Sequence, residues 1–197
     1  MADGPLDPPL HIDWLEASAL RDGRAGRLGL TILPGKRGAS LRYPGRIYRR
    51  DLATDLATLR AVGVGLLVLL VDDDELARWG DPAIVEQALW AGITVERLPL
   101  ADGAAPRSPN EMDALLAHIA AGRDDGDVAV ACMGGVGRSG TVAACALVAA
   151  GWSAAGAIDG VRAVRHPTAV ETQEQIGFVY HYERHIAKRG RPDTVAP

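Results

Sequence analysis

The segment CMGGVGRS, residues 132–139, places a sulfur nucleophile before a glycine-rich loop and an arginine. Five residues separate Cys132 from Arg138, and three of them are glycines, which let a backbone curl tightly and point successive N–H groups inward. We expect a helix to follow, and the positive end of its dipole would add to these N–H groups. The guanidinium of Arg138 is a planar fork that fits two phosphate oxygens. The loop therefore predicts a site for a tetrahedral anion such as phosphate.

The same groups would activate the cysteine. A thiol has an ordinary pKa of about 8.5, which a helix N-terminus or a neighbouring cation lowers, and a thiolate below a bound phosphate can attack phosphorus. The hydroxyl of Ser139 could donate a hydrogen bond to the sulfur and help it leave when a phosphocysteine is hydrolysed. The alternative is a glycine-rich turn that carries an ordinary buried cysteine, because free cysteines are often buried. The residues expected to hold the phosphate, besides Arg138, are Met133, Gly134, Gly135, Val136 and Gly137.

The position of these residues depends on the strand and the helix that flank the loop. The apolar run DVAVAC (127–132) predicts a buried strand, and apolar spacing predicts a helix from about Arg138 to Ala150. We expect Asp81 to cap a short helix, and Ser108 and Glu111 to form a capping box at the start of another. Further strands are expected at 11–16, 26–33, 65–71 and 93–98, and further helices at 51–63, 81–91, 153–164 and 170–187. This alternation predicts an α/β fold with a central, mainly parallel sheet of about five strands flanked by helices, in which ligands bind at the carboxyl ends of the strands.

Composition and charge are typical of one soluble domain. The chain has 197 residues, of which 48% are apolar and 23% charged, and its net charge of −4 argues against a nucleic-acid binder. Two cysteines are too few for a disulfide scaffold and suggest a reducing, cytoplasmic location, and we recognise no signal peptide or membrane-spanning run. We expect a disordered tail at 1–10, one domain at 11–187 and a second disordered tail at 188–197.

The pattern Cys-x5-Arg followed by Ser or Thr resembles the signature loop of the cysteine-dependent protein tyrosine and dual-specificity phosphatases. Within that superfamily the chain is most similar to the kinase-associated phosphatases of the cyclin-dependent-kinase inhibitor family, from about Leu28 to Ile186. Besides the loop, the similarity rests on the segments LGLTILPGKR, PLADGAAP, VAACALV and ETQEQIGFVYHYE, in that order. The resemblance implies a phosphatase domain of dual-specificity size in which Cys132 is the nucleophile and Arg138 binds the phosphoryl group, without a cofactor.

The resemblance also implies a general acid. In the family, an aspartate on a loop about thirty residues before the cysteine protonates the leaving group, and Asp102 lies 30 residues before Cys132. Asp102 follows the strand expected at 93–98, so it should lie at the same edge of the sheet as Cys132. Without the loop, Asp102 and Gly103 would indicate only an Asp-Gly turn.

Two positions depart from the family pattern. Many members position the water of the second step with two glutamines, in the pattern Gln-Thr-x-x-Gln; here Gln175 matches the second, but Glu171 stands in place of the first. Glu171 could orient water but would also repel phosphate, and the alternative for both residues is a solvated first helical turn. Ala131 stands where the family usually has a histidine that helps to hold the loop, so we expect a less depressed cysteine pKa and weaker activity.

The run Asp72-Asp73-Asp74 follows the buried strand expected at 65–71, and three adjacent carboxylates could indicate a metal site. Consecutive side chains point in different directions, however, and no matching cluster of ligands is apparent. We therefore expect a solvated loop and the start of a helix, and no metal.

Our leading hypothesis is a metal-independent phosphatase that hydrolyses phosphate monoesters through a phosphocysteine intermediate. Its substrates would be phosphotyrosine or phosphoserine and phosphothreonine in proteins, with phosphoinositides and small esters left open. The alternative is a catalytically weak pseudophosphatase that acts as a phosphate-binding module. A third hypothesis is a sulfur-transfer enzyme of rhodanese type, which Asp102 and Ser139 disfavour. We expect a monomer with no nucleic-acid or membrane partner.

Overall fold

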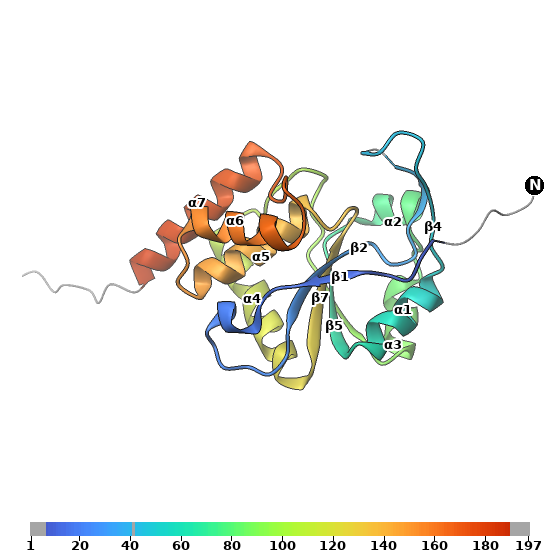
Figure 1. Ribbon diagram of the computed structural model, residues 1–197, viewed down its shortest axis with the longest axis horizontal. Coiled ribbons are helices and arrows are strands. Elements are labelled where there is room, and N and C mark those ends of the chain that lie inside the picture. Colours follow the sequence, from blue (N-terminus) through green and yellow to red (C-terminus); the bar gives the residue numbers. More distant parts are fainter. Residues whose placement is uncertain (1–6, 41, 190–197) are drawn as a thin grey trace, which may run out of the picture.

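The chain forms three layers, with a five-stranded sheet between two groups of helices (Figure 1). A computed structural model of the protein describes residues 7–40 and 42–189. In sheet order, the strands are β1 (Ile12–Trp14), β2 (Leu28–Ile32), β7 (Asp127–Cys132), β5 (Val64–Leu69) and β6 (Thr94–Arg97). Only β1 runs antiparallel to its neighbour, while β2, β7, β5 and β6 are parallel. The predicted α/β fold with a mainly parallel sheet of about five strands is therefore confirmed.

The two groups of helices cover opposite faces of the sheet (Figure 1). One face carries α4 (Pro109–Asp125), α5 (Gly137–Ala149), α6 (Ala154–Val164), α7 (Gln173–Arg189) and a 3-10 turn at Ala17–Leu20; the other carries α1 (Leu52–Ala61), α2 (Asp73–Trp79) and α3 (Ile84–Trp90). Successive side chains of β7 alternate between the two faces, because a strand has a period of two residues. Cys132 belongs to the core under α5, whereas Ala131 belongs to the core under α1 and α3.

A short hairpin lies outside the main sheet, at the carboxyl ends of its parallel strands. It consists of β3 (Arg37–Ala39) and β4 (Ile47–Arg49), at the upper right of Figure 1. A buried ion pair joins both ends of the hairpin to α1: Arg50 Nη2 donates to Asp55 Oδ1 (2.7 Å), and Gly35 N donates to Asp55 Oδ2 (2.8 Å). This hairpin was not predicted, because its two strands have only three residues each and none of these residues is buried.

The remaining expected elements are present, with shifts at their ends. The helix expected from Asp81 begins at Ile84, because the Asp81 carboxylate accepts from Ala83 N (2.9 Å) and forms a turn ahead of the helix. The helix expected at 170–187 runs from Gln173 to Arg189. Ser108 caps α4 as predicted, but Glu111 accepts from the N–H of Arg107 rather than from that of Ser108.

The predicted tails lie partly outside the described residues. Within them, Leu10 is buried, Pro8 accepts a hydrogen bond from Arg50 Nη2 (3.1 Å), and Lys188 belongs to α7. Among the helices in the described part of the chain, none is both long enough and apolar enough to cross a membrane.

Candidate active site

The glycine-rich loop connects the central strand to the most buried helix. Cys132 is the last residue of β7, only 3% exposed, and α5 begins five residues later at Gly137. Gly135 has φ +66°, and a Cβ there would lie 2.3 Å from the carbonyl oxygen of Thr31. A Cβ on Gly137 would lie 2.5 Å from a carboxylate oxygen of Glu171, whereas Gly134 has room for one. Gly135 is thus required by its backbone conformation and by the close approach of Thr31 O, whereas at Gly137 the close groups are side-chain ends.

Two cations hold the outer side of the loop. Arg165 donates from Nη2 to Gly134 O (3.0 Å) and from Nε to Gly135 O (2.9 Å), and Lys36 Nζ donates to Met133 O (3.1 Å). Because these carbonyls are engaged from outside, the loop is held in place without a histidine before the cysteine. Ala131 itself is fully buried in the apolar core and makes no contribution of this kind.

The surroundings of Cys132 favour its thiolate. Burial alone would raise the pKa of the thiol, but the Arg138 guanidinium, the Ser139 hydroxyl and the N–H groups of Ser139 and Gly134 together lower it below its ordinary value. The Ser139 hydroxyl is fully buried and has no nitrogen or oxygen partner among the described residues, which leaves it for the sulfur. The other cysteine, Cys145, lies inside α5, where burial raises its thiol pKa well above the ordinary value.

Arg138 is fixed by a carboxylate that the sequence analysis did not identify. Its Nη1 donates to Glu75 Oε2 (2.5 Å) and to Leu100 O (2.8 Å), and its Nη2 donates to Glu75 Oε1 (2.8 Å). Arg138 is 1% exposed, so this bidentate pair is formed largely out of water. Burial alone would lower the pKa of Arg138, but the hydrogen bonds to Glu75 and the neighbouring negative charges raise it.

Asp102 lies at the same edge of the sheet, beside the arginine. Its Oδ1 accepts from Arg138 Nη2 (3.2 Å), and its side chain is 76% exposed. The loop around it is attached to the start of α7, since Thr172 Oγ1 donates to Gly103 O (2.7 Å). The structure therefore brings Asp102, Arg138 and Cys132 together, with the Asp102 carboxylate exposed to solvent.

Gln175 and Glu171 also lie against the loop, packed on Gly137. Gln175 is fully buried; its Oε1 accepts from Glu171 N (2.9 Å) and its Nε2 donates to Ala104 O (3.2 Å). The Glu171 carboxylate forms an ion pair with Arg42 from the β3–β4 hairpin. Gln175 thus links α7 to the Asp102 loop, and the charge of Glu171 is countered.

The aspartates 72–74 do not come together as a metal site. Asp72 caps α2 by accepting from Glu75 N (2.8 Å), and Asp73 pairs with Arg97 (2.6 Å). The described residues contain no group of three or more His, Cys, Asp or Glu side chains placed to hold a metal ion. The run instead forms the start of a helix, as expected, and that helix delivers Glu75 to Arg138.

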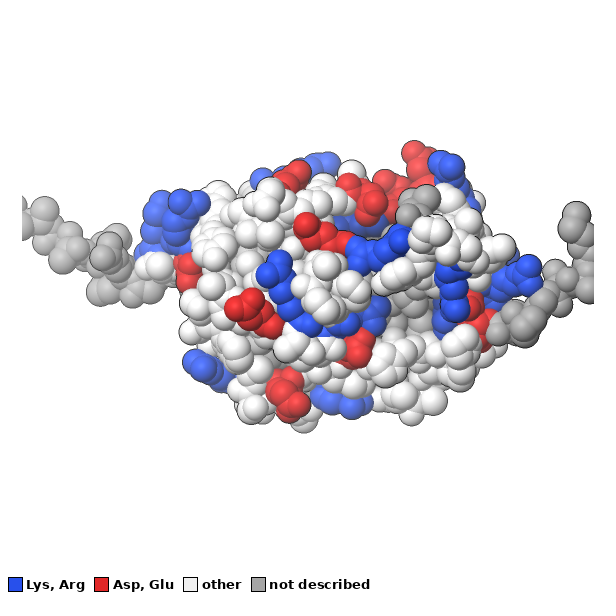
Figure 2. Space-filling model, turned by 45° about the horizontal axis from the view of Figure 1, so that its top comes forward, with Lys and Arg blue, Asp and Glu red and all other residues white. Residues whose placement is uncertain are grey.

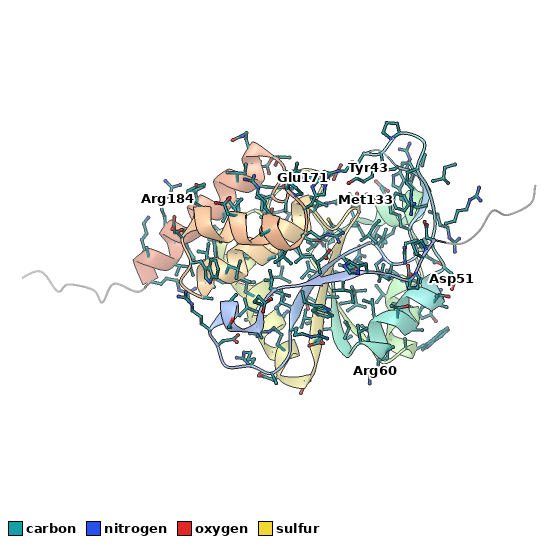
Figure 3. The ribbon with its side chains drawn as sticks, in the orientation of Figure 1. Tyr43, Asp51, Arg60, Met133, Glu171 and Arg184 are labelled. Atoms are coloured by element: carbon teal, nitrogen blue, oxygen red, sulfur yellow. The ribbon has the colours of Figure 1, made fainter. Side chains whose placement is uncertain are left out.

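A pocket of about 580 Å³ lies beside the loop. Its walls come from the N-terminal segment, the β3–β4 hairpin, α2, the Asp102 loop and the segment before α7; among its lining residues are Lys36, Tyr43, Tyr48, Asp102, Met133 and Glu171. Figure 3 shows Tyr43, Met133 and Glu171 close together on the upper side of the molecule. Figure 2 brings this side forward and shows lysine and arginine side chains around a hollowed surface. The loop residues Met133, Gly134 and Val136 thus line a space large enough for a small ligand, directly beside the candidate nucleophile.

A cysteine at the carboxyl end of the central strand, below a loop that an arginine closes, defines a protein of the tyrosine phosphatase class. The chain belongs to the PTP-SAK family, described as "Swiss Army Knife protein, DSP-PTPase phosphatase domain", whose model matches residues 43–188. This result confirms the resemblance to protein tyrosine and dual-specificity phosphatases.

Known proteins support the same assignment. Human cyclin-dependent kinase inhibitor 3 is 26% identical over 181 residues, which cover 91% of this chain and 81% of the relative. Kinase associated phosphatase, solved with its catalytic-site cysteine substituted by serine, has a TM-score of 0.78 at 26% identity and covers 92% of this chain and 98% of its own. Tk-PTP in its active form has a TM-score of 0.64 at 30% identity, covering 83% of this chain and 93% of its own.

Proposed function

We propose that the protein is a cysteine-dependent phosphatase that hydrolyses phosphate monoesters through a phosphocysteine intermediate. The observation that carries the proposal is the position of Cys132 at the carboxyl end of β7, directly before the glycine-rich loop and the buried Arg138, where its thiol pKa is lowered. A thiolate in this position faces the place where loop N–H groups and the guanidinium would hold a phosphoryl group.

In the first step, the Cys132 thiolate attacks phosphorus, an S–P bond forms and the bond from phosphorus to the ester oxygen breaks. Asp102, in its protonated form, gives its proton to the departing oxygen. The Nη atoms of Arg138 donate four hydrogen bonds, three of them to Glu75 and Leu100. The fourth, to the exposed Asp102, is the longest at 3.2 Å. Substrate binding would displace Asp102 from Arg138, which frees an Nη2 donor for the phosphoryl oxygens and releases the acid toward the leaving group.

In the second step, water attacks phosphorus, its proton passes to the Asp102 carboxylate, and the S–P bond breaks to restore the thiolate. Ser139 is the group that stabilises the departing sulfur, since its hydroxyl contributes to the lowered pKa of Cys132. Glu171 and Gln175 are the candidates for positioning this water, because both pack against Gly137 at the start of α5.

We infer that the substrate is a phosphorylated protein or a small phosphate ester, and that the reaction needs no metal or cofactor. The similarity to cyclin-dependent kinase inhibitor 3 and kinase associated phosphatase supports a phosphorylated substrate. The pocket volume of about 580 Å³ lies in the range of small-molecule sites, so small esters are included.

The test is hydrolysis of an aryl phosphate by the purified protein in the presence of a chelator. Cys132→Ser should abolish turnover, whereas Cys145→Ala should retain it, because Cys145 is buried in α5 and its thiol pKa is raised. Rapid quenching of the wild-type protein with substrate should reveal a phosphoryl group on the peptide that contains Cys132. Turnover that persists in Cys132→Ser would refute the mechanism.

The second candidate is a pseudophosphatase that binds phosphate without turnover. It is favoured by one observation: the amide oxygen of Gln175 accepts backbone hydrogen bonds and the Glu171 carboxylate is paired with Arg42, so both groups are already engaged. This candidate predicts phosphate binding by the wild-type protein with no release of phenol.

A further inference from the structure

Lys36 is a buried cation that the proposed chemistry does not use. It follows β2 at the carboxyl edge of the sheet, is 6% exposed and lines the pocket beside the phosphate loop. Its Nζ lies 4.0 Å from the centre of the Tyr48 ring and donates to Met133 O. An ammonium has three donors, and this is the only hydrogen bond of Lys36 Nζ within the described residues.

The arginines around the loop and the pocket are already paired. Arg138 binds Glu75, Arg165 binds Asp13, Arg50 binds Asp55 and Arg42 binds Glu171. No carboxylate of the described residues lies within ion-pair distance of Lys36. Burial lowers the pKa of Lys36 to about 8. The negative charges of Cys132, Asp102 and Glu75 act in the opposite direction, but their effect is smaller. A buried cation is costly to a fold, and two donors of Lys36 Nζ have no partner within the described residues, so a negative group of a ligand in the cavity can bind there.

Lys36 contacts a different group of the loop from those that would hold a phosphoryl group over Cys132. It contacts a carbonyl oxygen of the loop, Met133 O, whereas the thiol of Cys132 accepts from the loop N–H groups of Gly134 and Ser139. A phosphoryl group over Cys132 would be held by those N–H groups and by Arg138. An anion on Lys36 would therefore be a second group of the same ligand.

We propose that Lys36 forms a second anion subsite, and that the preferred ligand is a compact phosphate ester with a further phosphate next to the one that lies over Cys132. Tyr48 is stacked against the ammonium and forms an apolar wall, and the pocket of about 580 Å³ accommodates a phosphorylated ring of the size of a polyol. This inference rests on the proposed function for the statement that the phosphate over Cys132 is the one that is cleaved. The binding of the two phosphates does not depend on cleavage.

The experiment compares ligands in the Cys132→Ser background by calorimetry. The probes are myo-inositol 4,5-bisphosphate, myo-inositol 4-phosphate, and phosphatidylcholine vesicles that contain phosphatidylinositol 4,5-bisphosphate, so that soluble and lipid forms of the same chemistry are distinguished. We expect the bisphosphate to bind at least tenfold more tightly than the monophosphate. A charge-assisted hydrogen bond in a site of low exposure raises the binding affinity by a factor of about ten or more.

Two variants separate the charge of Lys36 from its contact with the loop. Lys36→Gln keeps a donor for Met133 O but removes the charge, and should lower the preference for the bisphosphate about tenfold while monophosphate binding changes little. Lys36→Met removes both. The control is Arg37→Gln, which removes the adjacent cation; Arg37 is exposed and does not line the pocket.

The outcomes distinguish the two proposals. Equal loss of bisphosphate and monophosphate binding in Lys36→Gln, or an unchanged preference, would show that Lys36 only braces the loop and would overturn the subsite. Tighter binding of a doubly phosphorylated peptide than of either inositol form would overturn the assignment to a compact ester. A preference that depends on Lys36, in a wild-type protein with no turnover of any ester, supports the subsite and refutes only the phosphatase.

Discussion

Replacing Lys36 with methionine should stabilise the fold at neutral pH. The pKa of Lys36 is lowered from its ordinary value of 10.5 to about 8, mainly by burial. At about 1.4 kcal/mol per pKa unit, keeping this ammonium charged in the folded protein costs about 3 kcal/mol relative to the unfolded chain. Methionine has a similar length and keeps the contact with Tyr48, but it loses the hydrogen bond to Met133 O, worth about 1 kcal/mol. The pKa of about 8 already includes the attraction of the neighbouring negative groups, so we expect a net gain of about 2 kcal/mol in the free energy of unfolding.

The pH dependence has a definite sign. Between pH 8 and pH 10.5 the unfolded chain retains the proton on Lys36 while the folded protein releases it, so this residue makes the wild-type protein more stable as the pH rises. Lys36→Met lacks this contribution. The advantage of the variant should therefore be largest at pH 7 and should shrink by pH 9.5, in urea denaturation followed by circular dichroism.

The matched control is Arg37→Met, which removes an exposed cation of β3 and should change stability by no more than about 0.5 kcal/mol. If Lys36→Met is less stable than the wild-type protein at pH 7 by more than about 1 kcal/mol, the contacts of the ammonium outweigh its burial. Lys36 would then be explained as a structural brace, and the reasoning that its charge awaits a ligand would be wrong.

Three further predictions concern the chemistry. Glu75→Gln should lower kcat/KM for an aryl phosphate about tenfold to a hundredfold and weaken inhibition by inorganic phosphate, because Arg138 loses a charged bidentate partner; unchanged kinetics would mean that Glu75 does not position the guanidinium. Asp102→Asn should slow alkyl phosphates far more than nitrophenyl phosphate, since only the poor leaving group needs a proton, and equal slowing of both would exclude the acid role. The thiolate absorbance of Cys132, measured against Cys132→Ser, should titrate below the ordinary thiol range, and Ser139→Ala should move its midpoint upward; a midpoint unaffected by Ser139→Ala would show that the hydroxyl does not reach the sulfur.

The central part of the site could be predicted from the sequence because its geometry is local. The strand 127–132 and the helix that follows are apolar enough to be buried in any arrangement, and the loop between them contains the cysteine, the glycines and the arginine in one segment. Asp102 follows β6, which is parallel to β5 and β7, so the topology brings it to the same edge. Its role as the acid was indicated by the family resemblance, because the residues alone suggested only an Asp-Gly turn, and its contact with Arg138 was not predicted.

The residues that were missed depend on contacts between distant segments. Glu75 and Lys36 also follow parallel strands and therefore lie at the active edge, which was the available signal, but the acidic run before Glu75 was interpreted only as a metal site or a solvated helix start. Arg165 had no such signal, because it sits at the end of α6 and reaches the loop only through tertiary packing. The β3–β4 hairpin was missed because three-residue strands with exposed side chains have no apolar pattern to detect.

The role of Ala131 can now be argued from the loop's supports. Absence of a histidine before the cysteine was expected to leave the loop less well held and the thiol less acidic. The structure holds the loop from its outer side instead, with Arg165 on two carbonyls and Lys36 on a third, and the pKa of Cys132 is still lowered by Arg138 and Ser139. Of these two supports, Arg165 is paired with Asp13, whereas Lys36 has no carboxylate partner in the described part of the chain. A ligand with a second phosphate would thus bind the same cation that helps to hold the loop, so that binding at the subsite would also favour the arrangement of the loop around Cys132.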